Sequence, residues 1–531
     1  ERLQRRADHL VHADARAEDI PVLEHAAKAA LDGSAAQGAL NLGNAALARL
    51  AGRPANDETL MRVRLLVASA LAMARMPEEA ARLHHEVLGG NPPPMVLARA
   101  YLDLGQSQFT MGRLEACFES YRRAAKTLGY RPPRLASGRA LLQAWRSLRE
   151  IWWESRRPRT YDGGRPVDPV PSMLADVLNF EARARFFSED KAAALLILES
   201  LRNARRSGDL KAHGRILSQA GGQLASALGR TTLSRRMLDA SVRAAEASGD
   251  LSVIALTRAT RLMIYGAMGE FDRLDRERPE VESLVARVGD AWCTALFLSY
   301  LFDVAQERGR AGEGLGVVTG FAESLVSSKT REYGVSWAHN RGAWVALAVG
   351  RPDLARAIID RTVEMELFRK DRPLQGYVRA WDVQTALDEG DPDRAIRAAE
   401  TYARSLASGS LAKRHQAIST YVAAKACAGA VLETGAGPEG LGVLRRILQT
   451  GRGLARPFPI YRAQIALVDA RLMLLEGRRE AARRHVEHLL AQAARLPAGT
   501  LVAAETMILA ASLAGGGDSP RGRALLRRAF E

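Results

Sequence analysis

The sequence predicts an all-α protein, a right-handed α-solenoid of tetratricopeptide-like helix-turn-helix repeats. Two observations support this prediction. Alanine and leucine are abundant and aromatic residues make up only 6% of the 531 residues, a mixture that suits helices better than sheets. Glycines also recur at intervals of 40 to 45 residues, and a period near 40 is typical of stacked helix pairs. These glycines are Gly229, Gly269, Gly309, Gly350, Gly390, Gly435, Gly477 and Gly517.

Each predicted repeat consists of a first helix, a tight glycine turn, a second helix and a looser turn. Glycine suits the tight turn because it adopts the left-handed conformation that ends a helix. After Gly390, Asp391 can cap the second helix and Pro392 suits its first turn. The looser turns read "SGD" at 207–209 and 248–250 and "VGD" at 288–290. There we expect glycine to end the second helix and aspartate to begin the next repeat.

Residues 1–129 are predicted to form N-terminal helical repeats with a shorter spacing. The stretch "YLDLGQSQFTMGRLEACFESYRRAAKTLG" at 101–129 closely resembles a tetratricopeptide repeat, and "RLLVASALAMARMPEEAARLHHEVL" at 64–88 is a degenerate copy. Gly112 is the expected turn of the clearer copy. Its expected packing residues are Leu104, Gly105, Cys117, Tyr121 and Ala124.

Residues 130–172 interrupt the register of the repeats. A helix carrying Trp145, Trp152 and Trp153 is expected first, followed by a segment rich in Pro, Gly and Arg. That composition does not favour regular structure, so 155–171 is interpreted as a linker or insert. Residues 173–531 are then predicted to form a C-terminal array of about eight to nine repeats with the period near 40.

The bulk composition limits the compartment and the class of partner. Three cysteines lie far apart and form no CxxC motif, which fits a reducing cytoplasm, and no segment has the length of a membrane span. The formal net charge is +16, which keeps nucleic acid among the possible partners. The arginines are nevertheless spread among many acidic residues, which is typical of a solvated surface. Because the chain starts at Glu1 within a helical pattern, we expect it to be part of a longer protein.

Four stretches carry a resemblance to a family of multidomain proteins. They are 5–50, "GRALLQAWRSLRE" before the basic break, 180–209 and 456–485. Together they resemble the C-terminal tetratricopeptide-like region of large bacterial signalling proteins. In that family an effector precedes a signal-transduction ATPase and the helical tail; the effector is a class III adenylate/guanylate cyclase, a serine/threonine kinase or a DNA-binding domain. The resemblance implies a regulatory, protein-binding tail with the ATPase and effector upstream in the same polypeptide.

The sequence shows no motif that would make this segment an enzyme. It lacks a phosphate-binding loop, a nucleophile elbow, an HExxH zinc motif and the kinase motifs, so no catalytic residue and no cofactor are expected. Two histidine pairs are candidate metal ligands, His84 with His85 and His485 with His488. The first pair is adjacent on a helix and points apart, and the second lacks a third ligand, so structural or solvated histidines are favoured.

The concave surface lined by the first helices is the predicted binding surface. Residues about 6, 10 and 13 positions before each turn glycine should face it, and rings with amides there suit an extended peptide. The other interpretation is that Trp337 and Trp344 merely seal adjacent repeats. The predicted groove residues are Gln219, Gln223, Trp337, Asn340, Trp344, Tyr377, Gln384, Lys425 and Arg471.

Two other functions remain open from the sequence. One alternative is a basic scaffold that binds nucleic acid, because pairs of arginines lie on the second helices. These pairs are scattered over the convex face, which is weaker evidence for nucleic-acid binding than a groove lined with basic residues. Those pairs are Arg235–Arg236, Arg445–Arg446, Arg478–Arg479, Arg483–Arg484 and Arg527–Arg528. A stand-alone adaptor without an upstream effector is the second alternative.

Overall fold

The structure, a computed structural model, is built of helices throughout its described part. It describes residues 17–33, 35–74, 76–131, 166–223, 231–310, 333–364, 366–406, 412–435, 437–493 and 500–530, together with 142, 145, 146, 149 and 312. No strand occurs among these residues. The predicted all-α solenoid is therefore confirmed. Of the predicted helix between 130 and 155, Trp145 is helical, whereas Trp152 and Trp153 lie outside the described residues.

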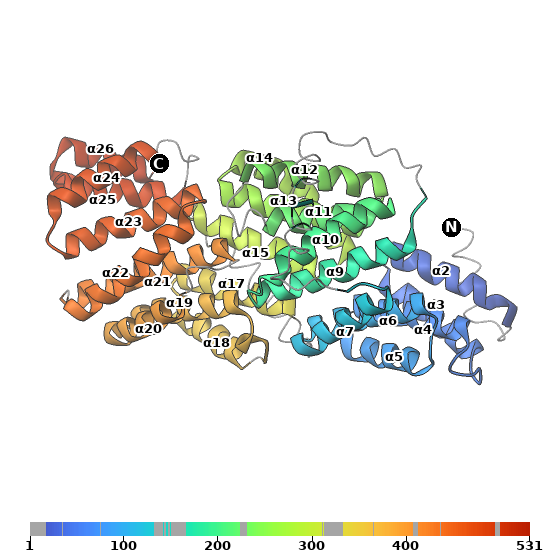
Figure 1. The fold of residues 1–531 in the computed structure, drawn as a ribbon. Helices are drawn as coiled ribbons and strands as arrows, with labels where there is room; N and C mark the ends of the chain where they lie inside the picture. The colour runs from blue at the N-terminus through green and yellow to red at the C-terminus, as the bar shows by residue number, and fades with distance from the viewer. Residues whose placement is uncertain are drawn as a thin grey trace.

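The N-terminal part consists of three helix pairs, which Figure 1 shows in blue. A short 3-10 helix, η1 (Ala17–Asp19), precedes them. The pairs are α2 (Ile20–Asp32) with α3 (Ala36–Arg49), α4 (Glu58–Met73) with α5 (Pro77–Gly89), and α6 (Pro94–Thr110) with α7 (Leu114–Thr127).

The C-terminal part continues the same alternation of first and second helices. Its first helices are α9 (Pro169–Phe187), α11 (Leu210–Gln223), α13 (Leu251–Met268), α15 (Ala291–Glu307), α17 (Tyr333–Ala348), α19 (Arg372–Asp388), α21 (Lys413–Glu433), α23 (Pro459–Leu475) and α25 (Leu501–Leu513). Its second helices are α10 (Ala192–Ser207), α12 (Thr231–Ser248), α14 (Phe271–Val288), α18 (Pro352–Val363), α20 (Pro392–Ser405), α22 (Pro438–Ala455), α24 (Arg479–Ala493) and α26 (Pro520–Phe530). Two short 3-10 helices, η3 (Glu366–Arg369) and η4 (Gly516–Asp518), lie in connections.

The predicted linker ends earlier than expected. Residues 155–165 lie outside the described residues, but 169–171 already belong to α9. The carboxylate of Asp168 accepts a hydrogen bond from the backbone N–H of Val170 at 3.2 Å, and Pro169 occupies the first helical position. Aspartate before a helix and proline at its first position both favour a helix start. The residues that begin α9 therefore lie within the segment predicted to be a linker.

The turns have the predicted conformation at most of the expected glycines. Six of them have a positive φ, between 68° and 81°: Gly269, Gly309, Gly350, Gly390, Gly435 and Gly477. Gly229 lies outside the described residues. Gly517 does not fit the prediction, because the left-handed residues of that turn are Gly515 and Gly516 and Gly517 belongs to η4.

The looser turns also follow the sequence prediction. Gly208, Gly249 and Gly289 are left-handed and end the second helices. The carboxylates of Asp250 and Asp290 then cap α13 and α15 by accepting hydrogen bonds from backbone N–H groups three residues on, at 3.0 Å and 2.7 Å. Glycine ends one helix because it adopts the left-handed conformation found at helix C-termini. Aspartate begins the next because its carboxylate accepts a hydrogen bond from a free backbone N–H of the first turn.

The pair α6 and α7 shows the packing expected of a tetratricopeptide repeat. Gly105 on α6 lies against the ring of Tyr121 on α7, and a Cβ at Gly105 would come within 2.5 Å of that ring. Tyr121 and Cys117 are fully buried between the two helices. The small residue of the first helix thus lets the aromatic ring of the second approach closely, which fixes the distance between the helices.

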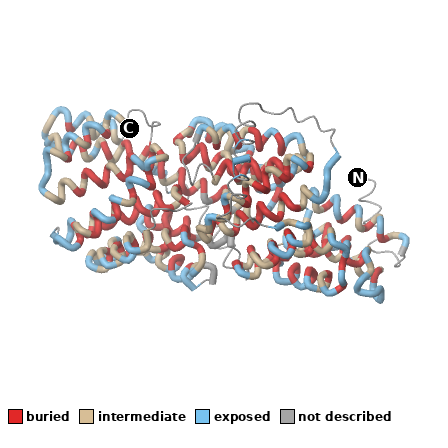
Figure 2. Tube along the Cα trace, viewed as in Figure 1, coloured by how far each residue is buried: buried red, intermediate tan, exposed pale blue. Residues whose placement is uncertain are grey.

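The array curls so that helices distant in sequence meet. Successive first helices contact one another, as α11 with α13 and α13 with α15. In addition α17 contacts α6, α13 contacts α23, and α15 contacts α25 (Figure 1). Burial follows the inner layer of first helices, whereas the outer second helices expose one side to solvent (Figure 2). A single large apolar cluster extends from α6 to α25.

Candidate functional site

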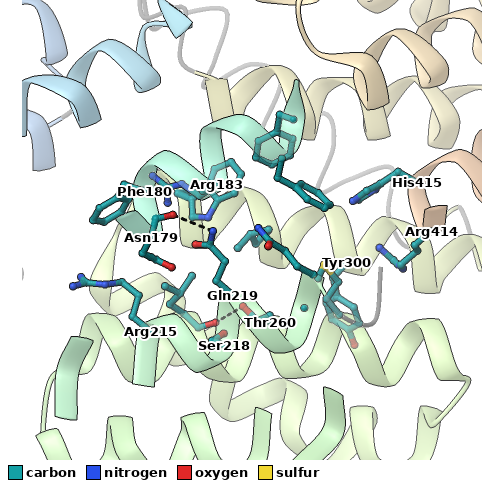
Figure 3. Close-up of a pocket in the computed structure, with 18 of the residues that line it drawn as sticks. Asn179, Phe180, Arg183, Arg215, Ser218, Gln219, Thr260, Tyr300, Arg414 and His415 are labelled. Carbon is teal, nitrogen blue, oxygen red and sulfur yellow. Dashed lines mark hydrogen bonds between the residues drawn. The ribbon is translucent and has the colours of Figure 1, made fainter. Parts of the chain in front are cut away.

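A pocket opens on the inner surface where first helices from several repeats converge. It has a volume of about 130 Å³, and its residues come from α9, α11, α13, α15, α17 and α21. Figure 3 shows these side chains pointing from different helices toward a common space. The lining consists of Asn179, Phe180, Arg183, Phe186, Phe187, Arg215, Ser218, Gln219, Gly222, Gln223, Leu256, Thr260, Met263, Trp292, Leu296, Tyr300, Asp303, Arg341, Arg414 and His415.

Arg183 on α9 is the most unusual charge in this pocket. Its guanidinium lies over three aromatic rings, 4.8 Å from the centroid of Phe109, 4.7 Å from Phe180 and 5.1 Å from Trp292. Its Nε is buried without a hydrogen-bond partner, and no described carboxylate forms an ion pair with it. Burial lowers the pKa of Arg183. The rings stabilise the cation through their faces, but they leave its buried Nε–H without a hydrogen-bond acceptor.

Arg215 on α11 lies beside Arg183 on the same wall of the pocket. Its guanidinium is 5.4 Å from the centroid of Phe180, so both arginines share that ring. Unlike Arg183, it forms an ion pair with Asp176 on α9. Its Nε remains buried without a partner, which leaves one further donor near the pocket.

Two buried side chains that line the same space each carry an oxygen without a hydrogen-bond partner. The Oδ1 of Asn179 and the Oγ of Ser218 have no partner, and each residue is only 1% exposed. Gln219 reaches across from α11, and its Nε2 donates to the backbone oxygen of Asn179 at 3.2 Å (Figure 3). Buried polar groups are rarely left unsatisfied, because each costs about 1–3 kcal/mol of stability. Both residues line the pocket, where a bound group would supply the missing hydrogen-bond partners.

The far side of the pocket is closed by an ion-paired cluster that we call the Asp303 cluster. It consists of Asp303, Arg341, Tyr377, Arg414 and His415. Asp303 on α15 forms ion pairs with Arg341 on α17 at 2.9 Å and with Arg414 on α21 at 2.8 Å. The Arg341 guanidinium also lies 4.0 Å from the ring centroid of Tyr377, whose hydroxyl is 2.8 Å from Nδ1 of His415. Burial and the two arginines lower the pKa of His415 well below its usual value, so the imidazole is neutral.

The predicted groove residues have different surroundings in the structure. Gln219 and Gln223 line the pocket. Trp337 belongs to α17, and its side chain lies outside the described part. Gln384 is half-buried, and its amide donates to the carboxylate of Asp388 at 2.8 Å. Lys425 and Arg471 both pair with Glu505 on α25, at 2.6 Å and 3.7 Å.

The aromatic part of the prediction needs a correction. Trp344 is 5% exposed and stacks on Trp381 with ring centroids 5.3 Å apart, so it is not a surface tryptophan. Asn340 is buried too, and its Oδ1 accepts a hydrogen bond from the indole N–H of Trp381 at 2.7 Å. Tyr377 is fully buried on the other side of Trp381. These residues join successive repeats, which is the alternative that the sequence also allowed for Trp344.

The pocket residues of α9 escaped prediction because the first turn of the array lacks a glycine. The left-handed residue after α9 is Glu189, with a φ of 55°. Counting back 6 and 10 positions from Glu189 gives Arg183 and Asn179, both in the pocket. Counting back 6 and 13 positions from Gly309 gives Asp303 and Leu296, which also line the pocket. Counting back from the left-handed residue of the turn therefore finds pocket residues, but the turn at Glu189 contains no glycine that would identify it in the sequence.

The histidine pairs have ordinary structural surroundings. His84 is buried, and burial lowers its pKa to about 4. Ring Nε2 of His485 lies 3.0 Å from the backbone oxygen of Ala466. Within the described ranges, no three His, Cys, Asp or Glu side chains are grouped to hold a metal ion. Within the same ranges, no helix combines the length and apolar composition needed to cross a membrane.

These features define the class of protein: an all-α solenoid of tetratricopeptide-like helix pairs with a pocket on its inner surface. No known protein-family profile matches the chain, and no curated protein matches it.

Several solved structures align with the chain. The tetratricopeptide domain of P58(IPK) is 14% identical, with 76% of this chain and 98% of that chain covered and a TM-score of 0.19. A chain of Naa15/Naa10 bound to HypK-THB is 12% identical, with 96% and 100% covered and a TM-score of 0.21. A circular tandem repeat protein is 15% identical, with 99% and 95% covered and a TM-score of 0.12. With TM-scores this low, the fold assignment rests on the helices of this chain.

Proposed function

We propose that this chain is a non-enzymatic protein-interaction solenoid that binds a segment of a partner protein on its inner surface. The observation that carries the proposal is the pocket itself, to which six first helices contribute. Concave sites with apolar walls and a few convergent polar groups are the usual form of a binding site. Buried unpaired donors at Arg183 and Ser218 supply the polar part, and Phe180 and Trp292 supply the apolar part.

We further propose that the solenoid is the regulatory tail of a larger cytoplasmic signalling protein. The four stretches that resemble the tail of bacterial cyclase, kinase and transcription-regulator proteins support this role. In such a protein, a ligand in the pocket would bias the curvature of the array and thereby the upstream ATPase and effector. The gene sequence upstream of Glu1 tests this part: an ATPase with an effector supports it, and a start codon at this point supports a stand-alone adaptor.

The nucleic-acid alternative is less well supported by the charges. Several basic pairs of the second helices contact acids: Arg235 pairs with Glu270, Arg445 with Glu476 at 2.7 Å, and Arg446 with Glu400 at 3.7 Å. Neutralised arginines contribute little to phosphate binding. Titration with double-stranded DNA at rising salt separates the alternatives, because phosphate binding weakens steeply with salt.

Selection of peptides from a random library on the immobilised chain tests the binding function. We expect selected peptides to bind the purified protein in titration calorimetry and to lose affinity in Leu256→Trp, which narrows the pocket from α13. Leu354→Trp on α18, also half-buried but away from the pocket, is the matched control. Peptides whose affinity is the same in both variants would place protein binding elsewhere on the solenoid.

A further inference from the structure

The chemistry of the pocket indicates what kind of group it accepts, an inference that rests on the binding function proposed above. We propose that the pocket binds a carboxylate carried on a ring-sized apolar group, with Arg183 and Arg215 holding the carboxylate and Phe180 and Trp292 packing against the apolar part. Two sources share this chemistry: the C-terminal residue of a protein segment, and a free small carboxylic acid.

The charges around the pocket leave an excess of cations. Four arginines line it, and Asp303 is the single carboxylate among the described residues that do so. Asp303 is shared between Arg341 and Arg414. Arg215 has Asp176 as its partner, whereas Arg183 forms no ion pair with a described carboxylate and feels only the more distant charge of Asp290. A buried charge without a counter-charge is costly, so an anion beside Arg183 would relieve the imbalance.

The position of the donors suits a planar anion. A guanidinium presents a fixed fork of N–H groups that matches a carboxylate, and charge-assisted hydrogen bonds of this kind are about twice as strong as neutral ones. The unpartnered hydroxyl of Ser218 on α11 adds a neutral donor to the same wall. The unpartnered Oδ1 of Asn179 supplies an acceptor, which a peptide N–H next to the carboxylate would satisfy.

Size and polarity favour an organic acid over inorganic phosphate. The volume of about 130 Å³ is near that of engineered cavities of about 150 Å³ that bind benzene, so one ring-sized group fits. The walls are mainly apolar and include the aromatic rings of Phe180, Phe186 and Trp292. A strongly hydrated phosphate would lose its water without gaining partners on those walls, whereas a carboxylate with an apolar body satisfies both parts of the lining.

Titration calorimetry on the wild-type chain tests the inference without any variant. The probes are phenylacetate, N-acetylphenylalanine, N-acetylphenylalanine amide and inorganic phosphate. We expect at least one of the two acids to bind, with the neutral amide weaker by at least about tenfold because it lacks the charged acceptor. Equal binding of acid and amide, binding of phosphate as tight as that of the acids, or binding of neither acid would overturn the inference.

Variants then assign the carboxylate to its residues. Arg183→Gln and Arg215→Gln should each weaken binding of the acids by about tenfold or more. Arg484→Gln, an exposed arginine on α24, should leave it unchanged. Unchanged binding in both pocket variants would contradict the assignment. If Arg183→Gln fails to fold, the inference is still tested by the affinity of Arg215→Gln for the acids and by the comparison of acid with amide in the wild type.

Peptides ending in phenylalanine show whether the carboxylate comes from a protein C-terminus or from a free acid. They also test the carboxylate site separately from the proposed binding of a protein segment. Tighter binding of a free C-terminal carboxylate than of the amidated peptide or of phenylacetate supports a protein segment as the source. Binding of phenylacetate but of no peptide supports the pocket chemistry with a free acid and contradicts protein binding. Peptides that bind equally with either terminus support protein binding and contradict the carboxylate.

Discussion

Asp303 and Arg414 are 111 residues apart in the sequence, yet their side chains form an ion pair of 2.8 Å in which both are buried. Asp303 lies near the end of α15 and Arg414 near the start of α21, and the first helices α17 and α19 lie between them in the chain. Neighbouring repeats are held together by apolar contacts and by local polar contacts such as that between Trp381 and Asn340. This ion pair instead joins two distant repeats and holds the curl of the array beside the pocket.

Replacing Asp303 tests the contribution of this ion pair to stability. Asp303→Asn removes the carboxylate that forms ion pairs with the buried guanidiniums of both Arg341 and Arg414, so we expect the free energy of unfolding to fall by about 3–5 kcal/mol. Chemical denaturation followed by circular dichroism measures the change. Asp360→Asn, an exposed aspartate on α18, is the control and should be neutral within about 0.5 kcal/mol. Equal effects of the two substitutions would show that the Asp303 pairs do not stabilise the fold.

Glu307, one helical turn beyond Asp303, should make stability depend on pH. Burial, together with the charge of Asp303, raises the pKa of Glu307 to about 8, from an ordinary value of 4.5. Between these two values the folded state binds the extra proton and the unfolded state does not. Stability should therefore fall as the pH rises from about 4.5 to about 8, with a slope of at most about 1.4 kcal/mol per pH unit from this group.

Denaturation at a series of pH values measures this slope in the wild type and in Glu307→Gln. The glutamine is neutral at every pH, so its slope in this window should be smaller than that of the wild type. Glu439→Gln, an exposed glutamate at the start of α22, should retain the wild-type slope. Identical slopes in wild type and Glu307→Gln would contradict a raised pKa at this position.

The periodic part of the fold could be predicted from the sequence because each repeat carries its own turn signal. A turn with positive φ, such as that at Gly350 with a φ of 75°, favours glycine, so the glycine identifies the turn in the sequence. The same reasoning located Gln219 and Gln223 in the pocket. It failed at α9, where Glu189 adopts the left-handed conformation without being glycine, and so Arg183 was not identified.

The curl of the array could not be predicted, because it depends on contacts between repeats rather than within them. Nothing near Asp303 in the sequence indicates that its partner is Arg414. The burial of Trp344 has the same origin, since the ring that covers it, Trp381, comes from the next repeat. Local periodicity places a residue on the inner face but does not show whether another helix covers it.

Two glycine substitutions of opposite expected sign test the turn conformation. Gly350→Ala places a Cβ on a residue with a φ of 75°, which costs about 1 kcal/mol although the surrounding space is open. Gly442→Ala, within helix α22 and also in open space, should instead stabilise by about 0.5–1 kcal/mol. Thermal melts of both variants measure the difference. A stabilised Gly350→Ala would show that this turn is not left-handed in solution.

Trp344→Ala distinguishes the buried role of this residue from the binding role that the sequence suggested. The ring is 5% exposed and stacks on Trp381 at an angle of 18°, so its removal leaves a cavity between α17 and α19. We expect a loss of about 3–5 kcal/mol in the free energy of unfolding. Gln384→Ala on the neighbouring surface of α19 is the control, since it removes one exposed hydrogen bond to Asp388 and should cost less than about 0.5 kcal/mol. A Trp344→Ala variant that unfolds at the wild-type denaturant concentration would show that the ring is not part of the core, and would restore it as a candidate for partner binding.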